Sequence, residues 1–448
     1  MSIPGPFTRV TAARPPGPEM ACRTCGAVLN TFTSTDHPTQ VQHVHPDRPE
    51  PWDHSPQPIP ADQLAFLDRR CDFCGDEFPL LRYATSDRIR LLAVSGADRL
   101  TNDYGDTWAA CASCARLVEA GDPDPLWRHA IRRIGWSPRD AHARSARDLH
   151  SSVLASILPG RVLITSTRWP HSPPHPRGLP KIRERLAQLL RGDDRLPAVA
   201  DPATLRADLA EGIDQSRLYW IDPEFTDLTH HATPSLPATT LTQSDVPVPH
   251  GLLLWDHPVG PHALTAASWT TTDTGNRHLT AYRGFGAGLP DAVLPDLRAG
   301  LGWLLPVAHT RLAPGDPIGG DQICAPLVVT WLLIAQRLAE ISTPVLRPAE
   351  QRAYARTGRP VPDVRLVHLR PRPQRRPTTR RSSSSPVSRP APETRDWITG
   401  FWREQPYGPK HSLRRPRYVT AYLRGPRDAP INASTAVRVL AVPTPPKR

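Results

Sequence analysis

The chain has 448 residues, of which 39% are hydrophobic, so it is long and apolar enough to bury a sizeable core. Its 55 prolines and 27 glycines predict many loops and short elements rather than long helices. The first residues lack the apolar segment of a signal peptide, and the longest apolar run, at residues 325–335, is about half of a membrane span. We therefore expect a soluble cytoplasmic protein.

The net charge of +12 is concentrated at one end of the chain. Residues 371–448 contain 17 Arg and Lys against 4 acidic residues, a net charge of +13, so the remaining residues sum to −1. Any attraction to phosphate therefore belongs to this C-terminal part.

Composition and patterning predict an α+β fold, in which an N-terminal zinc-ribbon-like module precedes a mixed α/β central domain and a basic C-terminal β block. The expected segments are a disordered tail (1–20), a zinc-binding module (21–120), a helical connector (121–160), a mixed α+β core domain (161–370), a disordered basic linker rich in Pro, Ser and Arg (371–395) and a basic aromatic block (396–448). We expect the last block to complete the sheet of the core domain.

Six of the seven cysteines form three CxxC pairs, a spacing at which both thiolates can reach one tetrahedral ion. The pairs Cys71/Cys74 and Cys111/Cys114 predict a four-cysteine zinc site, with short strands in the 36 residues between them. A redox pair is the alternative, but no thioredoxin-like pattern surrounds these cysteines.

The pair Cys22/Cys25 needs two further ligands, and the nearest candidates are His43 and His45. These histidines are only two residues apart, whereas finger histidines usually lie three to five apart. His37 and His54 are reserves, and exchange of partners with another cysteine pair is also open. Closed sites of this kind predict a structural role for one or two Zn²⁺ ions. The seventh cysteine, Cys324, is expected to be a buried thiol.

The connector contains two expected helices, the second beginning after Ser137 as N-cap. In the core domain, apolar runs predict strands at residues 161–169, 216–222, 251–260, 262–271, 277–285 and 364–370, and helices at 179–192 and 324–341.

No nucleotide-binding or hydrolase motif is present, so a catalytic role would depend on scattered residues near strand ends. A cluster of His, Arg and Asp can cleave RNA by acid–base catalysis. The candidates are Asp256, His257, Arg283, His309 and Arg311, although lone histidines at strand ends more often bind backbone carbonyls.

In the C-terminal block, arginines and aromatic residues alternate, so phosphate contacts and base stacking are both available. The candidates for binding DNA or RNA are Arg403, Arg414, Arg415, Arg417, Tyr418, Tyr422 and Arg424. The alternative is a sheet edge with a solvated basic face. The two interpretations are compatible. A single strand over RPRYVTAYLRG would place Arg417, Val419, Ala421 and Leu423 on one face and Tyr418, Thr420, Tyr422 and Arg424 on the other.

Several stretches resemble two groups of proteins. CDFCGDEFP together with WAACASCARLVEAGD resembles a zinc-ribbon-like segment of uncharacterised actinobacterial proteins. GLLLWDHPVG, CAPLVVTWLLIAQRLAE and ITGFWREQPYGPKHSLRRPRYVTAYLRGP resemble hypothetical proteins of streptomycete-type plasmids, phages and integrative elements. The resemblance implies an actinobacterial host and a mobile-element setting, and it carries no catalytic residues.

The sequence therefore favours a zinc-containing protein of a mobile element that binds nucleic acid through its C-terminal block and is not an enzyme. A metal-independent ribonuclease toxin and a protein-interaction scaffold are the alternatives.

Overall fold

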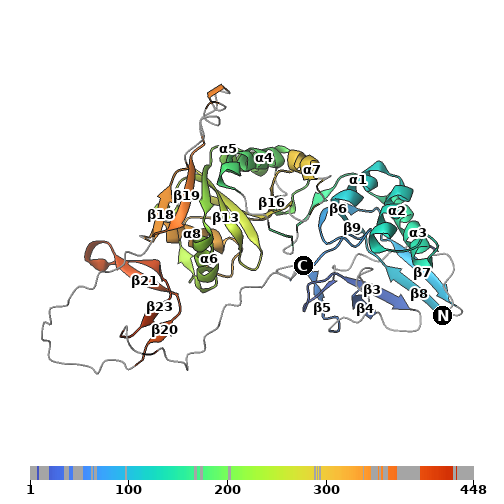
Figure 1. Ribbon diagram of the computed structural model, residues 1–448, viewed down its shortest axis with the longest axis horizontal. Helices are drawn as coiled ribbons and strands as arrows, with labels where there is room; N and C mark the ends of the chain where they lie inside the picture. Colours follow the sequence, from blue (N-terminus) through green and yellow to red (C-terminus); the bar gives the residue numbers. More distant parts are fainter. Residues whose placement is uncertain are drawn as a thin grey trace.

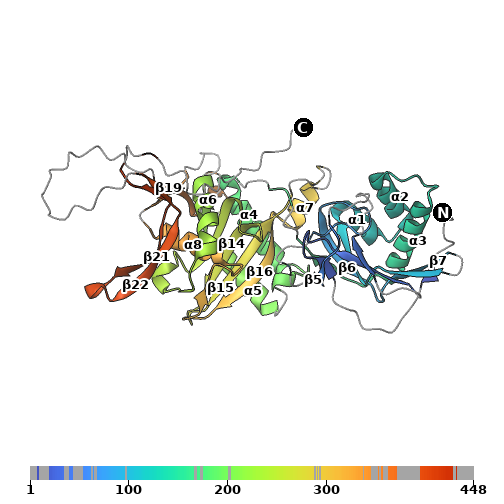
Figure 2. The same ribbon diagram turned by 90° about the horizontal axis from the view of Figure 1, so that it is seen from below.

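The computed structural model describes residues 8–9, 20–34, 40–43, 54–61, 64, 68–95, 98–165, 169–171, 175–199, 203–286, 289, 291, 294–336, 338–344, 352, 355–356, 362–370, 394–426 and 430. The expected disordered tail and linker lie almost wholly outside these residues. The protein has a mixed α/β fold, in which a cysteine-containing N-terminal module and a C-terminal β block lie at opposite ends of a central domain (Figures 1 and 2).

Small antiparallel sheets form the N-terminal module, with strand orders β1-β7-β8-β3-β4, β10-β6-β9 and β2-β5. The strands are β1 Thr8–Arg9, β2 Met20–Cys22, β3 Leu29–Ser34, β4 Gln40–His43, β5 Pro58–Pro60, β6 Pro79–Ala84, β7 Arg90–Ser95, β8 Asp98–Asp103, β9 Thr107–Cys111 and β10 Val162–Leu163. The short strands expected between the two cysteine pairs are therefore present.

The helices of this module are α1 Ala112–Ala120, α2 Pro123–Ile134 and α3 Ala141–Ser156. Helix α1 ends at Gly121, whose φ of 74° is the left-handed conformation that glycine adopts at low cost, and Asp122 then caps α2. Helix α3 begins at Ala141 after Asp140, later than expected, because the Asp140 carboxylate accepts a hydrogen bond of 2.8 Å from the Ser137 amide in a preceding turn.

The segment expected to be a connector belongs to the module. Helix α2 contacts α1, α3 contacts α2, and Leu126 and Val153 share one buried cluster with Cys71 and Cys114. Strand β10, which we expected in the central domain, pairs with β6 instead. The module therefore extends beyond residue 160.

A seven-stranded mixed sheet forms the central domain, with the order β16-β15-β14-β13-β11-β19-β18. Strand β11 is parallel to both β13 and β19, and the other neighbours are antiparallel. The strands are β11 Arg217–Ile221, β13 His250–Val259, β14 Leu264–Thr271, β15 Arg277–Gly284, β16 Leu304–Leu312, β18 Ala339–Ser342 and β19 Val364–Leu369. A separate short pair consists of β12 Thr239–Thr240 and β17 Pro317–Ile318.

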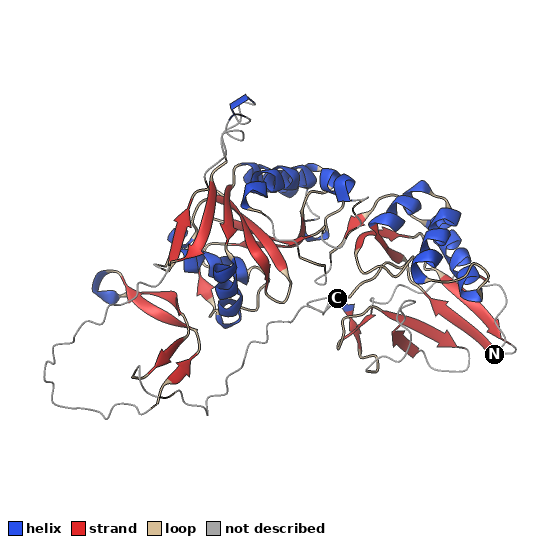
Figure 3. Cartoon of the chain, in the orientation of Figure 1, coloured by secondary structure: helices blue, strands red, loops and turns tan. Residues whose placement is uncertain are grey.

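Helices cover both faces of this sheet (Figure 3). They are α4 Leu179–Arg191, α5 Ala203–Asp214, α6 Pro223–Ala232, α7 Leu294–Gly300 and α8 Ala325–Ile334, with 3₁₀ turns η2 Pro176–Gly178, η3 Pro197–Val199, η4 Thr233–Ser235 and η5 Gln243–Asp245. Along β13, Leu252 and Leu254 join the core beneath α4 and α5, whereas Leu253 and Trp255 join the core of α6 and α8. A strand that is buried on both faces explains the continuous apolar run GLLLW.

Helix α8 is shorter than the sequence pattern predicts. It ends at Ile334, and the following β18 pairs with β19 at the edge of the sheet. Pairing with a neighbouring strand thus overrides the helix propensity of residues 338–341. Within the part of the chain that the structure describes, every helix is too short or too polar to cross a bilayer.

The C-terminal block pairs with itself rather than completing the central sheet. It contains β20 Asp396–Ile398 paired with β23 Tyr422–Arg424, and β21 Phe401–Tyr407 paired with β22 Leu413–Val419 through the turn η6 Pro409–His411. The edge position beside β19 is already taken by β18, so the described residues of the block form two separate ribbons.

We expect Gly251→Ala to destabilise the central domain, because a Cβ at Gly251 would lie 2.1 Å from the ring of Trp269 on the neighbouring strand. Trp269 is only 1% exposed and cannot move aside freely. Such overpacking costs about 1–3 kcal/mol of unfolding free energy, which denaturant titration measures. Gly300→Ala is the matched control, since nothing lies within 4 Å of its Cβ position. Equal stability of the two variants would contradict this packing.

Candidate metal centres and nucleic-acid interface

Four cysteine thiols from two distant segments meet at one point in the N-terminal module. Cys71 and Cys74 lie in the loop before β6, and Cys111 and Cys114 lie at the junction of β9 and α1. Their sulfur atoms all lie within 4.8 Å of one another, and all four residues are buried. This group can hold a metal ion.

The spacing of the sulfurs fits tetrahedral coordination. Four sulfurs placed about 2.3 Å from a central ion lie about 3.8 Å apart. The Sγ atoms of Cys74 and Cys111 are separated by 3.8 Å. Cys111 is also the N-cap of α1, and its sulfur accepts a hydrogen bond of 3.5 Å from the Cys114 amide. The helix start therefore aims a thiol and an amide at the same point.

A second group contains Cys22, Cys25, His43 and His54, whose ligand atoms also lie within 4.8 Å of one another. The distance from sulfur to His Nε2 is 3.4 Å in both Cys22–His54 and Cys25–His43. A tetrahedral ion bound by sulfur and imidazole nitrogen gives an edge of about 3.6 Å. This group can therefore hold a metal ion as well.

The Cys22/Cys25 loop and the Cys71/Cys74 loop share one backbone geometry. In each, the glycine after the second cysteine donates to the carbonyl of the first cysteine at 2.8 Å, from Gly26 to Cys22 and from Gly75 to Cys71. Both glycines are left-handed, with φ of 75° and 74°. The CxxCG sequence thus encodes a tight turn in which the glycine is required by its positive φ.

Amides that face the sulfur favour the thiolate form that binds metal. Burial acts to raise the pKa of Cys22, but hydrogen bonds from the backbone of Gln57, Cys25 and Thr24 lower it to about 5. The Gln57 amide lies 3.5 Å from this sulfur. In the four-cysteine group, a hydrogen bond from Cys114 lowers the pKa of Cys111. Each group therefore contains a thiol that is ready to act as a ligand near neutral pH.

Two histidines of these centres are absent from the leading sequence interpretation. His54 takes the place for which we preferred His45, and His45 lies outside the described residues. His129 of α2 hydrogen-bonds with Cys111 and Cys74, and these bonds raise its pKa to about 9. No spacing rule signals His54, because a loop of 28 residues separates it from Cys25.

The five catalytic candidates do not form one site. Near the end of β13, His257 lies 3.1 Å from Asp227 and 3.5 Å from Asp256. Arg283 is buried nearby and donates to the His262 carbonyl and the Thr165 hydroxyl. Arg311 lies opposite His278 on β15. His278 is five residues from Arg283 along the same strand, a distance of about 17 Å.

His309 belongs to this second, distant group. Its ring stacks on His278, and its Nδ1 hydrogen-bonds with the Thr280 hydroxyl at 3.1 Å. Burial lowers the pKa of His309 to about 4, so the ring is neutral at physiological pH. His257 pairs with Asp227 and Asp256, whereas His309 pairs with His278 and Thr280, so the candidates do not converge on a common substrate position.

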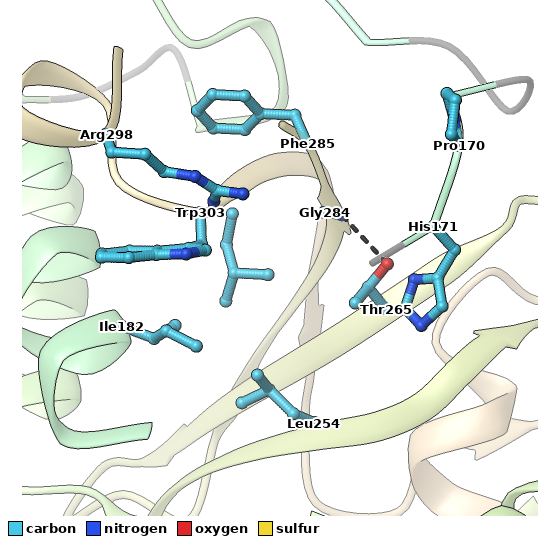
Figure 4. Close-up of a pocket in the computed structure, with 10 residues that line it drawn as sticks. Pro170, His171, Ile182, Leu254, Thr265, Gly284, Phe285, Arg298 and Trp303 are labelled. Atoms are coloured by element: carbon cyan, nitrogen blue, oxygen red, sulfur yellow. Dashed lines mark hydrogen bonds between the residues drawn. The ribbon is translucent and has the colours of Figure 1, made fainter. Parts of the chain in front are cut away.

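A small cavity lies at the strand ends near Arg283, between Arg298 and His171 (Figure 4). The Arg298 guanidinium lies over the rings of Trp303 and Phe285, and burial lowers its pKa to about 10. The cavity measures about 20 Å³, which is room for roughly one water molecule. It does not provide space for an RNA substrate.

One face of the β21–β22 ribbon carries three arginines together with Phe401, Tyr407, Leu413 and Val419. Arg403 lies directly opposite Arg417, and Gln405 lies opposite Arg415, so these side chains share one face. Arg415 also lies over the Tyr407 ring at 5.1 Å. On the other face, Trp402 packs against Tyr418 and donates a hydrogen bond of 2.9 Å to the Ala232 carbonyl.

The remaining nucleic-acid candidates lie elsewhere. Tyr418 is only 7% exposed and belongs to the core of the central domain. Arg414 is on the opposite face of the ribbon from Arg415. Tyr422 and Arg424 belong to β23, and Arg424 forms an ion pair with Asp396. The expected single strand is interrupted at Thr420, so only Arg403, Arg415 and Arg417 share a face.

Cys324 is a buried thiol at the start of α8, as expected, and burial raises its pKa to about 11.

Comparison with models of protein families, with curated proteins and with solved structures found no match for the chain. The arguments on function therefore rest on the geometry described above.

We expect Cys111→Ser to remove one of two bound metal equivalents, because it takes away a sulfur ligand while a serine can still cap α1. Metal analysis by mass spectrometry of anaerobically purified protein measures the stoichiometry. Cys324→Ser, which alters a buried thiol far from either group, should retain both equivalents. Retention of two equivalents by Cys111→Ser would contradict the four-cysteine centre.

We expect His54→Ala to remove the metal of the second group, whereas His45→Ala should retain it, because four described ligands already complete a tetrahedron. The same metal analysis distinguishes the two variants. Loss of metal in His45→Ala alone would restore the ligand set that we preferred from the sequence.

Proposed function

We propose that the protein binds duplex DNA through the basic face of the β21–β22 ribbon and that two structural zinc ions hold the N-terminal module in shape. The observation that carries the DNA proposal is the face shared by Arg403, Arg415 and Arg417. Its side chains are exposed or half-buried, and it contains no acidic residue.

The arrangement of charge on this face is unfavourable in isolation. Arg403 and Arg417 are directly opposite each other, and like charges at such positions destabilise a strand pair. Among the described residues, none of the three arginines on this face forms an ion pair. A polyanion would offset the repulsion by placing phosphates against the guanidinium groups.

The shape of the element favours duplex DNA over duplex RNA. The major groove of B-form DNA admits a two-stranded β-ribbon, whereas the major groove of A-form RNA is too deep and narrow to be read by side chains. The ribbon projects from the end of the central domain, so the major groove of a DNA duplex can approach it (Figure 2). Arg415 and Gln405 are side-chain types that read base edges in the major groove.

The ligand sets favour zinc. Tetrahedral groups of four sulfurs, or of two sulfurs and two imidazole nitrogens, are typical of structural zinc sites. In both groups all four positions are supplied by protein side chains, which leaves no position for a catalytic water.

The mobile-element setting of this function is a proposal that is supported by the resemblance of the C-terminal and cysteine-containing stretches to actinobacterial plasmid and phage proteins.

We expect the triple variant Arg403→Gln, Arg415→Gln, Arg417→Gln to weaken DNA binding and to flatten its salt dependence. Each lost phosphate contact lowers the slope of log affinity against log salt by about 0.9. Fluorescence anisotropy with a 20-bp duplex between 50 and 300 mM salt measures this slope. An unchanged slope would place the attraction outside the ribbon, and tighter binding of duplex RNA than of DNA would contradict the groove argument.

Two variants serve as controls for this experiment. Arg147→Gln removes an exposed arginine that is paired with Asp124 at 2.7 Å in the distant module, and it should leave binding unchanged. Arg414→Gln removes a charge from the other face of the ribbon and should have a smaller effect than Arg415→Gln.

A further inference from the structure

The N-terminal module contains a cavity of about 410 Å³ that is separate from the ribbon. It lies between the loop of Cys71, the end of α2 and the side of α3, and its volume is in the range of small-molecule sites, about 300–1,000 Å³. Val28 and Asp68, beside the Cys22/Cys25 loop, also line it, so the cavity borders both metal centres.

Aromatic rings form the walls of the cavity. Phe73 and Tyr104 pack against Trp108 with ring centroids 5.8 and 6.3 Å apart, and the Tyr104–Trp108 pair is stacked. Trp136, which is half-buried, lies 5.8 Å from the exposed His142 at the solvent side. Flat walls of this kind accept a planar ring by stacking.

Two side chains that line the cavity, Trp108 and His150, each contain a ring nitrogen without a hydrogen-bond partner in the described part of the chain. Trp108 Nε1 and His150 Nδ1 have no hydrogen-bond partner among the described residues, although each side chain is only 2% exposed. Such groups are rare in native proteins, since burial removes their bonds to water. Each nitrogen has less than 1 Å² of accessible surface, so a ligand with polar edges would reach it only after a small shift of the cavity wall.

The two atoms differ in their hydrogen-bonding roles. The indole Nε1 is a donor only. Burial keeps His150 neutral by lowering its pKa to about 4, and the backbone of Phe73 accepts a hydrogen bond from the ring. Because a neutral imidazole has one donor and one acceptor nitrogen, the unpartnered Nδ1 is the acceptor. Among the described residues, the cavity wall thus holds one unpaired donor and one unpaired acceptor.

We propose that this cavity binds a nucleobase, the planar nitrogen heterocycle whose edge carries both donors and acceptors. The ligand is either a free nucleoside or an unpaired base of a nucleic-acid strand, and both present the same chemistry to the aromatic walls. This inference is independent of the ribbon, because among the residues that the structure describes none that lines the cavity belongs to the C-terminal block.

Calorimetric titration of the metal-loaded full chain with adenosine, guanosine, cytidine, uridine and thymidine tests the proposal. We expect saturable binding of at least one nucleoside and none of ribose 5-phosphate. Trp136→Ala should weaken that binding by about tenfold through lost stacking. His150→Phe and Trp108→Phe should weaken it further while metal content and the melting temperature report on folding, and Arg147→Gln should not affect it.

Further measurements distinguish a free nucleoside from an unpaired base in a nucleic-acid strand. They also distinguish the cavity proposal from the ribbon proposal. Tighter binding of a single-stranded oligonucleotide than of the nucleoside, sensitive to Trp136→Ala, identifies an unpaired base in a strand; the reverse order identifies a free nucleoside. The triple arginine variant should bind nucleosides normally, so failure of the ribbon proposal leaves this result unchanged. Absence of saturable binding to every nucleoside and to the oligonucleotide would show that the cavity holds only water.

Discussion

The convergence of Cys71, Cys74, Cys111 and Cys114 on one point is the constraint on which the N-terminal module depends. The two pairs are separated by 36 residues, and the second pair forms the start of α1, so coordination would fix where β9 ends and where the helix begins. Helix α1 contacts α2, and α2 contacts α3. Phe73, which lies between two ligands, packs against Trp108 and His150. The four-cysteine group and the aromatic cavity are therefore built from the same loop, and an ion held by this group would support a wall of the cavity.

The sequence predicts the metal centres well where ligands are close together and poorly where they are not. A CxxCG turn is local, since its hydrogen bonds join residues within five positions of one another, so the pairs are readable without tertiary information. His54 is brought to Cys22 by the pairing of β2 with β5, a long-range event that no spacing reveals. The same limit applies to residues 339–341, which the sequence pattern places in a helix but which belong to β18 because β19 offers an edge. Strands buried on both faces, such as β13, were predictable because their apolar runs are continuous.

In the C-terminal block, the alternation of side chains was predictable but the partner of each strand was not. Tyr418 has an aromatic ring that could stack on a base, yet it is buried against Trp402. Gly400 is needed beside it, because a Cβ at Gly400 would lie 2.1 Å from the Tyr418 hydroxyl. This apolar anchor holds one face of the ribbon against the central domain. The period of two then forces Arg403, Arg415 and Arg417 outward together. The basic face is thus a consequence of the packing on the opposite side.

The two proposed sites differ in the physical origin of their affinity. The ribbon acts through charge, so its affinity depends strongly on ionic strength. The cavity acts through stacking and hydrogen bonds, which salt affects little, and its rim contains Asp68 and Asp72 as well as Arg69 and Arg70. The sites lie at opposite ends of a central domain whose core is continuous with that of the module (Figure 1). A nucleic-acid strand that bound both the ribbon and the cavity would have to pass along the central sheet. Its length, rather than its base composition, would therefore decide whether the affinities of the two sites combine.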